Sequence, residues 1–336
     1  MAAEIAEQPA VFERILAESQ PEVKAVAAQV RTAAPRFVLL AARGTSDHAA
    51  LYLKYLVEIV LGLPCGLASP STVTAYGVEP DFRDVLWVAV SQSGGSPDLL
   101  ESTRAAQRAG ALTLAVTNAP ASPLAQAAQL HLDIRAGEER AVAATKTYTA
   151  TLLTLWLLVE LWRGSDLSAA RTLPDLARVV VDEPAVEEVA DRFRFVDKVV
   201  VTGRGYSYPT AREAALKLME TSYLAAHAFS GADLLHGPLA MVDEDRPVVV
   251  VSPHGVAGRA LEPVLARLAE RGADVTLVGD ASHGSAAIVV PVPRIAEELS
   301  PLLEIIPLQR LAHRMAVARH HDPDAPRGLS KVTRTV

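Results

Sequence analysis

Two loops of the sequence concentrate hydroxyl groups and glycines of the kind that bind phosphate. The first is Gly44-Thr45-Ser46, and the second, residues 91–96, reads Ser-Gln-Ser-Gly-Gly-Ser. Glycines let the backbone approach a phosphate closely, and a helix that begins after such a loop offers free N–H groups with a favourable dipole. Hydroxyl groups add neutral donors, so a Lys or Arg is not required, and the loop contains none. The candidate phosphate ligands are Thr45, Ser46, Ser91, Gln92, Ser93 and Ser96.

The second loop also has a simpler interpretation. Ser96 precedes Pro97, and a serine before a proline at the first helical position is an ordinary N-cap. The presence of two hydroxyl loops at successive strand ends favours phosphate binding instead. A dinucleotide site and an ordinary ATPase are both disfavoured, because no strand is followed by G-x-G-x-x-G and the P-loop lysine is missing.

The elements that position these loops are short apolar strands that alternate with helical patterns. Because the strands are apolar throughout, they predict parallel sheets covered by helices on both faces, and ligands of such sheets bind beyond the carboxyl ends of the strands. A long helix is expected over residues 147–162. Strands are expected at residues 37–41, 85–90, 112–116, 130–134, 199–202, 248–251, 275–278 and 288–290.

The order of strands and turns occurs twice along the chain. Gly205 follows Gly44 by 161 positions, and Ser252 follows Ser91 by the same number. Shared spacing between strand ends predicts an internal duplication. The halves differ at the ligand loop, since Ser252-Pro253-His254-Gly255 replaces the hydroxyl-rich sequence. One half is therefore expected to bind a ligand that the other does not.

This repeat predicts the domain organisation. The chain is divided into an N-terminal helical segment (1–25), a first, phosphate-binding domain (26–165), a linker (166–195), a second domain (196–320) and a C-terminal tail (321–336).

Composition and charge exclude several classes of protein. The 336 residues carry a net charge of −7, which disfavours a nucleic-acid binder because such proteins have a basic face. The single cysteine, Cys65, allows neither an intrachain disulfide nor a cysteine metal site. The longest apolar stretch, residues 152–161, is too short to span a membrane, and the N-terminus has no signal pattern. We therefore expect a cytoplasmic protein with no metal, cofactor or membrane partner.

The motifs, taken in order, resemble the sugar isomerase (SIS) family. Along nearly its whole length the chain resembles the isomerase region of glutamine-dependent glucosamine-6-phosphate synthases. The resemblance implies two tandem SIS domains, each a parallel five-stranded sheet flanked by helices in a flavodoxin-like, three-layer α/β arrangement. Besides the two hydroxyl loops it rests on the start at Glu4-Ile5-Ala6-Glu7-Gln8-Pro9, and on Ala144-Thr145-Lys146-Thr147, Gly203-Arg204-Gly205, Ala215-Leu216-Lys217-Leu218, His236-Gly237-Pro238-Leu239-Ala240 and Pro326-Arg327-Gly328-Leu329-Ser330-Lys331.

The glutaminase domain of those synthases does not precede this region in the sequence. We therefore expect a relative that does not take ammonia from glutamine, and the closest resemblance is to a SIS-type glucosamine-6-phosphate deaminase. Such an enzyme converts glucosamine 6-phosphate to fructose 6-phosphate and ammonia through an open-chain imine. The alternatives are a fructosamine-phosphate deglycase, an ammonia-dependent synthase-like isomerase and, from another class, a sensor that binds a sugar phosphate without catalysis.

The resemblance also assigns roles to individual residues. It implies that Glu220 shuttles the proton between C2 and C1, that His236 opens the sugar ring and that Lys331 forms a Schiff base. In the family this histidine comes from the neighbouring subunit, so a homodimer is expected. Contacts with the substrate are implied for Val142, Glu213 and Lys217.

Spacing alone suggests other roles for the same residues. Glu213, Lys217 and Glu220 are four and three positions apart, which is typical of a solvated, salt-bridged helix face. His236 is then a turn residue, and Lys331 a solvated lysine of a terminal tail. If Glu220 is catalytic, enclosure by Met219 and other apolar neighbours is expected to raise its pKa.

Two departures from the family pattern concern the sugar pocket. Ala144 stands where the synthases have a serine near the sugar, and Ala232-Asp233-Leu234-Leu235 replaces a more polar run before the histidine. The sugar specificity is therefore left open.

Overall fold

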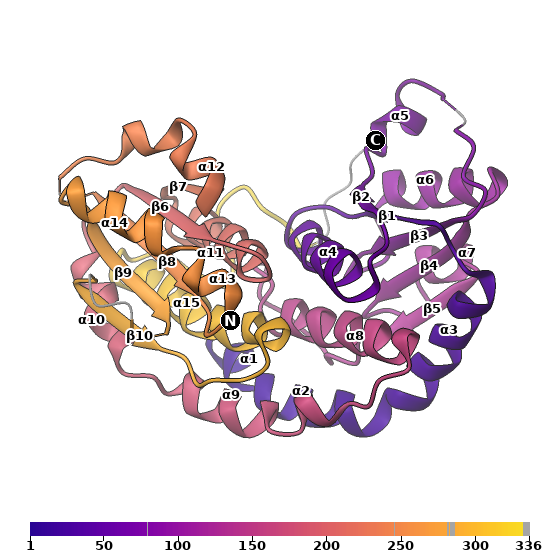
Figure 1. Ribbon diagram of the computed structural model, residues 1–336, viewed down its shortest axis with the longest axis horizontal. Helices are drawn as coiled ribbons and strands as arrows, with labels where there is room; N and C mark the ends of the chain where they lie inside the picture. Colours follow the sequence, from indigo (N-terminus) through magenta and orange to yellow (C-terminus); the bar gives the residue numbers. More distant parts are fainter. Residues whose placement is uncertain (79, 245, 281, 283–285, 332–336) are drawn as a thin grey trace. The chain divides into compact units, whose positions relative to one another are not determined.

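The computed structural model describes residues 1–78, 80–244, 246–280, 282 and 286–331. The chain forms two compact units (Figure 1). The first-sheet unit comprises Ala10–Glu139, Lys146–Arg171 and Ser330–Val336, and the second-sheet unit comprises Met1–Pro9, Arg140–Thr145 and Thr172–Leu329. Each unit is described on its own.

The first-sheet unit contains a five-stranded, fully parallel sheet in the order β2-β1-β3-β4-β5. Helices α3 and α4 each pack against α8 on one face, and α6 and α7 cover β3 and β4 on the other. The strands are β1 (Phe37–Ala41), β2 (Cys65–Leu67), β3 (Val85–Val90), β4 (Leu112–Thr117) and β5 (Leu130–Asp133). The helices are α2 (Gln8–Glu18), α3 (Gln20–Ala33), α4 (Thr45–Leu56) with the π-helical turn η1 (Val57–Leu61), α5 (Ser71–Thr74), α6 (Pro97–Arg108), α7 (Pro123–Ala127), α8 (Lys146–Arg163) and the turn η2 (Ser168–Ala170).

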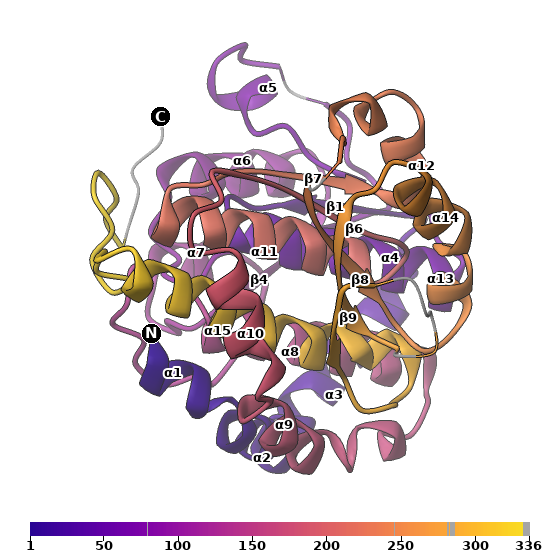
Figure 2. The same cartoon turned by 90° about the vertical axis from the view of Figure 1, so that its left-hand side faces the viewer.

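The second-sheet unit repeats this topology, since its strand order β10-β9-β8-β6-β7 is the same order read from the other edge. Figure 2 shows α11 and α15 on one side of this sheet and α12 and α14 on the other. The strands are β6 (Lys198–Gly203), β7 (Ala225–Ser230), β8 (Pro247–Ser252), β9 (Asp274–Gly279) and β10 (Ile288–Pro291). The helices and turns are α1 (Ala2–Ala6), α9 (Leu173–Val181), α10 (Ala185–Arg192), α11 (Ser207–Ser222), α12 (Gly231–Leu235), η3 (Pro238–Met241), α13 (Val256–Arg259), α14 (Glu262–Glu270), η4 (Glu297–Leu299) and α15 (Ser300–Ala318).

The central strands are apolar on both faces because both faces are covered. In β8 every residue is buried, and in β3 only the first residue is partly exposed. On the α6 side of the first sheet, Trp87 packs with Leu99 and Leu124 in one core cluster. The predicted fold class, two parallel five-stranded sheets flanked by helices, is confirmed.

The structure adds elements that the sequence pattern did not indicate. Strands β2 and β7 form the sheet edge next to β1 and β6, and residues 166–195, expected to be a linker, contain α9 and α10. The strands of each sheet fall within the predicted domains 26–165 and 196–320, whose exact boundaries stay a prediction. Within the described part of the chain, no helix combines the length and the apolar character that a membrane crossing requires.

Candidate functional site

The two hydroxyl loops lie at the same edge of the first sheet. In the order β2-β1-β3-β4-β5 the chain leaves β1 and β3 in opposite directions, which makes the gap between their carboxyl ends the topological switch point where such folds bind ligands. Thr45 and Ser46 form the first turn of α4 directly after β1. Residues 91–96, the phosphate loop, connect β3 to α6. The topology therefore brings both sets of candidate phosphate ligands to the same edge of the sheet, at the carboxyl ends of β1 and β3.

Hydroxyl groups support the phosphate loop from within. The Oγ of Ser91 accepts a hydrogen bond from the N–H of Gly94 at 3.2 Å, and the Oγ of Ser93 accepts one from Gly95 at 3.3 Å. A hydroxyl that accepts can still donate its own hydrogen to a ligand. Ser96 occupies the N-cap position of α6, but its side chain makes no capping hydrogen bond. The serine therefore stands at the predicted N-cap position, before Pro97, but its hydroxyl does not serve as the cap.

Backbone contacts fix the position of the phosphate loop. The carbonyl of Gln92 accepts from the N–H of Asn118, and the carbonyl of Gly94 accepts from Leu124. Gly94 has φ +60°, and a Cβ there would lie 2.1 Å from the Oγ of Ser122. Only glycine fits this position, because any side chain would collide with Ser122. The loop is therefore packed closely against the turn after β4.

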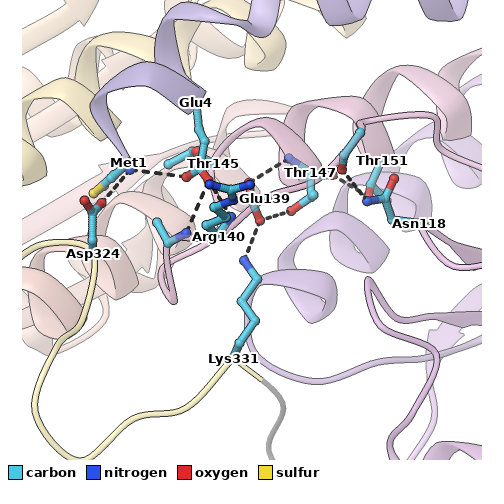
Figure 3. A network of polar contacts seen from close by, with 12 residues as sticks. Met1, Glu4, Asn118, Glu139, Arg140, Thr145, Thr147, Thr151, Asp324 and Lys331 are labelled. Atoms are coloured by element: carbon cyan, nitrogen blue, oxygen red, sulfur yellow. Dashed lines mark hydrogen bonds and ion pairs between the residues drawn. The ribbon is translucent and has the colours of Figure 1, made fainter.

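A lysine and a buried carboxylate meet in the first-sheet unit (Figure 3). The Nζ of Lys331 lies 2.8 Å from Oε2 of Glu139, whose side chain is fully buried. Glu139 also accepts hydrogen bonds from the backbone N–H and the hydroxyl of Thr147, at 3.1 and 2.6 Å. Thr147 is in the first turn of α8, where the helix dipole favours a carboxylate. Lys331 is thus paired with a buried carboxylate that other hydrogen bonds hold in place. Its side chain is only 26% exposed, which differs from a freely solvated lysine of a terminal tail.

Sequence reasoning missed Glu139. It lies outside regular secondary structure, eight residues before Thr147 and 192 before Lys331. No periodic pattern connects positions across a loop, so only the folded chain reveals this contact.

The acidic row on α11 is salt-bridged but largely buried. The Nζ of Lys217 lies 2.5 Å from Oε2 of Glu220 and 3.3 Å from Oε1 of Glu213. Glu213 and Lys217 have fully buried side chains, and that of Glu220 is 22% exposed, so the interpretation as a solvated face is wrong. Burial opposes the charge of Lys217, but the two carboxylates outweigh it and raise the pKa of the ammonium above its ordinary value. Met219 is itself 41% exposed and does not provide the expected apolar enclosure.

Two other candidates lie elsewhere in the second-sheet unit. His236 follows α12, and its side chain is exposed. Val142 lies in the segment between Glu139 and α8, where its N–H donates to the carbonyl of Asp324 at 3.0 Å. The same segment is held by Glu4, whose Oε1 accepts from the N–H of Ala141 at 3.2 Å.

The second sheet has its own switch point, but a carboxylate of the chain occupies it. Glu297 accepts hydrogen bonds from the N–H groups of Val256 and Ala257, at 2.9 and 2.7 Å. Val256 and Ala257 follow Gly95 and Ser96 of the phosphate loop by 161 positions. In the second half, a carboxylate of the chain thus accepts from the N–H groups that correspond to the end of the phosphate loop, and the predicted difference in ligand binding between the halves stays a prediction.

Next to this place, Glu304 is buried at the start of α15. Its Oε1 accepts from the hydroxyl of Ser207 at 3.1 Å, and its Oε2 has no hydrogen-bond partner among the described residues. Burial raises the pKa of this carboxyl from 4.5 to about 7, against the hydrogen bond from Ser207. Within the described residues no group of three or more His, Cys, Asp and Glu side chains could hold a metal ion.

Glu304 makes stability depend on pH in a defined direction. Its pKa is higher in the folded chain, so its contribution is fully present below about pH 4.5 and is lost as the pH rises through 7. The loss amounts to roughly 3 kcal/mol. Urea unfolding between pH 5 and 8 is expected to show wild type losing stability relative to Glu304→Gln, in which an amide replaces the protonated acid. A parallel pH dependence in both proteins contradicts the shift.

Comparison with known proteins gives the family. The SIS domain matches residues 34–161 and 193–317. Glutamine–fructose-6-phosphate aminotransferase [isomerizing] of Pseudomonas putida is 36% identical over 98% of this chain and 58% of its own length. The chain spans about half the length of the curated relatives that it matches.

Solved structures agree with this result. The crystal structure of a putative phosphosugar isomerase from Silicibacter pomeroyi superposes with a TM-score of 0.90, at 35% identity over 96% of this chain and 99% of that one. The glucosamine-6-phosphate deaminase of Thermotoga maritima superposes with a TM-score of 0.79 at 22% identity, over 99% of both chains, and shows the shared fold alone. The SIS domain model matches both halves of the chain, and the same sheet topology occurs once in each half. The chain therefore belongs to the SIS domain family.

Proposed function

We propose that the protein is a phosphosugar isomerase that deaminates glucosamine 6-phosphate to fructose 6-phosphate and ammonia. The observation that carries the proposal is the pair of Lys331 and buried Glu139 in the same unit as the phosphate loop. A lysine amine serves imine chemistry, and the hydroxyl loop serves the phosphate of the same kind of substrate. The relative of known structure at 35% identity carries the name putative phosphosugar isomerase, which supports the class of reaction.

The phosphate end of the sugar is assigned to the carboxyl edge of the first sheet, where β1 and β3 end. Hydroxyls of Thr45, Ser46, Ser91, Ser93 and Ser96 and the amide of Gln92 supply neutral donors there, and α6 contributes the positive end of its dipole. This arrangement binds the part of the substrate that does not react. Its binding energy then orients the carbon chain for the chemical steps.

The chemical steps need one base and one proton donor. His236 is assigned to ring opening, which exposes the C1 aldehyde. Glu220 then removes the proton from C2 and returns it to C1, while one proton of the amine is passed to O1, so that the C2 amine becomes an imine and the C1 aldehyde an alcohol. Lys217, paired with Glu220 and Glu213, holds this carboxylate in place.

Release of ammonia then takes place at the C2 imine. The amine of Lys331 attacks C2, ammonia leaves, and a protein-bound imine forms. Water adds to this imine, the bond to Lys331 breaks, and the ketose is released. We assign to Glu139 the proton that Lys331 must lose before it attacks, because its Oε2 lies 2.8 Å from the amine. Overall, one glucosamine 6-phosphate and one water give one fructose 6-phosphate and one ammonia.

A homodimer belongs to the proposal. The side chain of His236 is exposed, so it is available to a second copy of the chain. An inactive Glu220→Gln chain mixed with an inactive His236→Ala chain should regain part of the activity if each supplies what the other lacks.

The experiment incubates the purified protein with glucosamine 6-phosphate and measures ammonia and fructose 6-phosphate together. Equal amounts of both products are expected from wild type, and Glu220→Gln should lower the rate by about 10²- to 10⁴-fold, the range of a general acid–base residue. Glu188→Gln, an exposed glutamate of α10, is the matched control and should be unaffected.

The other outcomes identify the alternatives. Turnover of a fructosamine phosphate without turnover of glucosamine 6-phosphate indicates a deglycase. Binding of the sugar phosphate without any product indicates a sensor, and either result rejects the deaminase.

A further inference from the structure

Arg43 connects the two loops that flank the switch point of the first sheet. It directly precedes Gly44-Thr45-Ser46, and its Nη2 lies 2.8 Å from Oδ2 of Asp98. Asp98 is in the first turn of α6, immediately after the phosphate loop. The phosphate loop itself contains no Lys or Arg, and the fold brings a cation to its border from the end of the neighbouring strand.

The two partners of this ion pair differ in burial. The side chain of Asp98 is 3% exposed, and that of Arg43 is 45% exposed. Oδ1 of Asp98 accepts a hydrogen bond from the N–H of Leu99 at 2.9 Å, whereas Oδ2 faces Arg43 as an ion pair without an aligned hydrogen bond. Nη1 of Arg43 also donates to the carbonyl of Ala42 at 3.1 Å. The guanidinium is thus fixed at the carboxyl end of β1.

A buried carboxylate at this place opposes an anionic ligand. Asp98 lies in the first helical turn whose N–H groups and dipole would receive a phosphate, and two negative charges in one partly desolvated site repel each other. Arg43 neutralises the charge of Asp98 at Oδ2, while Oδ1 still accepts the hydrogen bond from the N–H of Leu99. With the charge of Asp98 neutralised, the electrostatic field at the N-terminus of α6 is that of the helix dipole, which favours an anion.

We propose that Arg43 is a positioning residue of the phosphate site, which acts through Asp98 and permits a phosphate dianion to bind at the start of α6. The inference rests on the proposed function only in taking residues 91–96 as a phosphate loop. It does not depend on which sugar is attached or on deamination.

The test measures binding of inorganic phosphate by titration calorimetry at constant ionic strength. Arg43→Met is expected to weaken binding by about tenfold or more, because Asp98 is left unneutralised beside the anion. Arg43→Lys keeps the charge and should stay within about threefold of wild type. Asp98→Asn alone should not weaken binding, because it removes the charge that Arg43 balances.

The double variant separates this role from a purely structural one. In the Asp98→Asn background, the further change Arg43→Met should alter phosphate affinity by less than about threefold, since no charge is left to neutralise. A tenfold loss in that background overturns the proposal, as does tight binding by Arg43→Met alone. The double variant carries no buried unpaired carboxylate, so it keeps the test valid if Arg43→Met does not fold.

Kinetics give a readout that general damage to the fold would not reproduce. Arg43→Met should raise KM for glucosamine 6-phosphate by the same factor as Kd for phosphate, with kcat within about twofold of wild type. If wild type binds phosphate in an Arg43-dependent way but releases no ammonia, the proposed function fails and this inference stands. If ammonia is released and KM is unchanged by Arg43→Met, the inference fails and the proposed function stands. No phosphate binding by wild type overturns the inference.

Discussion

Replacing Lys331 by arginine is expected to lower the rate of ammonia release by about 10³-fold or more, while the free energy of unfolding changes by less than about 1 kcal/mol. Arginine keeps the positive charge beside Glu139, so the contact with the buried carboxylate is retained. Its guanidinium stays protonated, however, and cannot attack an imine carbon. The substitution therefore separates the chemistry of Lys331 from its ion pair.

Trapping of the imine provides the measurement. Borohydride added during turnover should reduce the protein-bound imine of wild type, and mass spectrometry should find the sugar on the peptide that contains Lys331. Lys331→Arg should give no adduct, and Lys24→Arg, at an exposed position of α3, should behave as wild type. An adduct in the Lys331→Arg protein would assign the imine to another lysine.

Replacing Lys217 by methionine is expected to reduce the free energy of unfolding by about 3–5 kcal/mol. Methionine keeps most of the volume of the side chain, so packing changes little. Glu213, which is fully buried, would lose the ammonium that neutralises it at 3.3 Å. Removing one partner of a buried pair leaves the desolvation cost of the other unbalanced.

Calorimetric unfolding with two controls measures this effect. Lys198→Met, at an exposed lysine of the same unit, should change the free energy of unfolding by no more than about 0.5 kcal/mol. The double variant Glu213→Met with Lys217→Met should recover part of the loss, because both buried charges are then absent. A single variant as stable as wild type would show that the ion pair does not neutralise Glu213 in solution.

The central strands and the repeat were predictable because they rest on local patterns. Apolar runs such as β8 are buried on both faces and are recognisable without knowledge of their neighbours. The edge strands were not, since β2 has only three residues, including a glycine, and β7 mixes alanine with histidine and serine. Such segments become strands because β1 and β6 offer them partners, which is information from the tertiary structure.

The candidate site divides in the same way. The hydroxyl loops follow strands directly, so their position at the carboxyl edge follows from the strand assignment. Spacing showed that Lys217 reaches two carboxylates on α11, but whether that face is buried depends on the packing of α11 against α15. The contacts of Lys331 with Glu139 and of Arg43 with Asp98 join residues that share no helix or strand, and no sequence pattern predicts them.

Two copies of one fold would ordinarily provide two equivalent ligand sites, and Glu297 breaks that equivalence. An anion that approached Val256 and Ala257 would have to displace a carboxylate tethered to the same fold. A tethered competitor acts at an effective concentration of millimolar or more, whatever the concentration of free ligand. If the phosphate loop of the first half binds its proposed ligand, we therefore expect one such anion per chain, because the corresponding N–H groups of the second half already hold the carboxylate of Glu297.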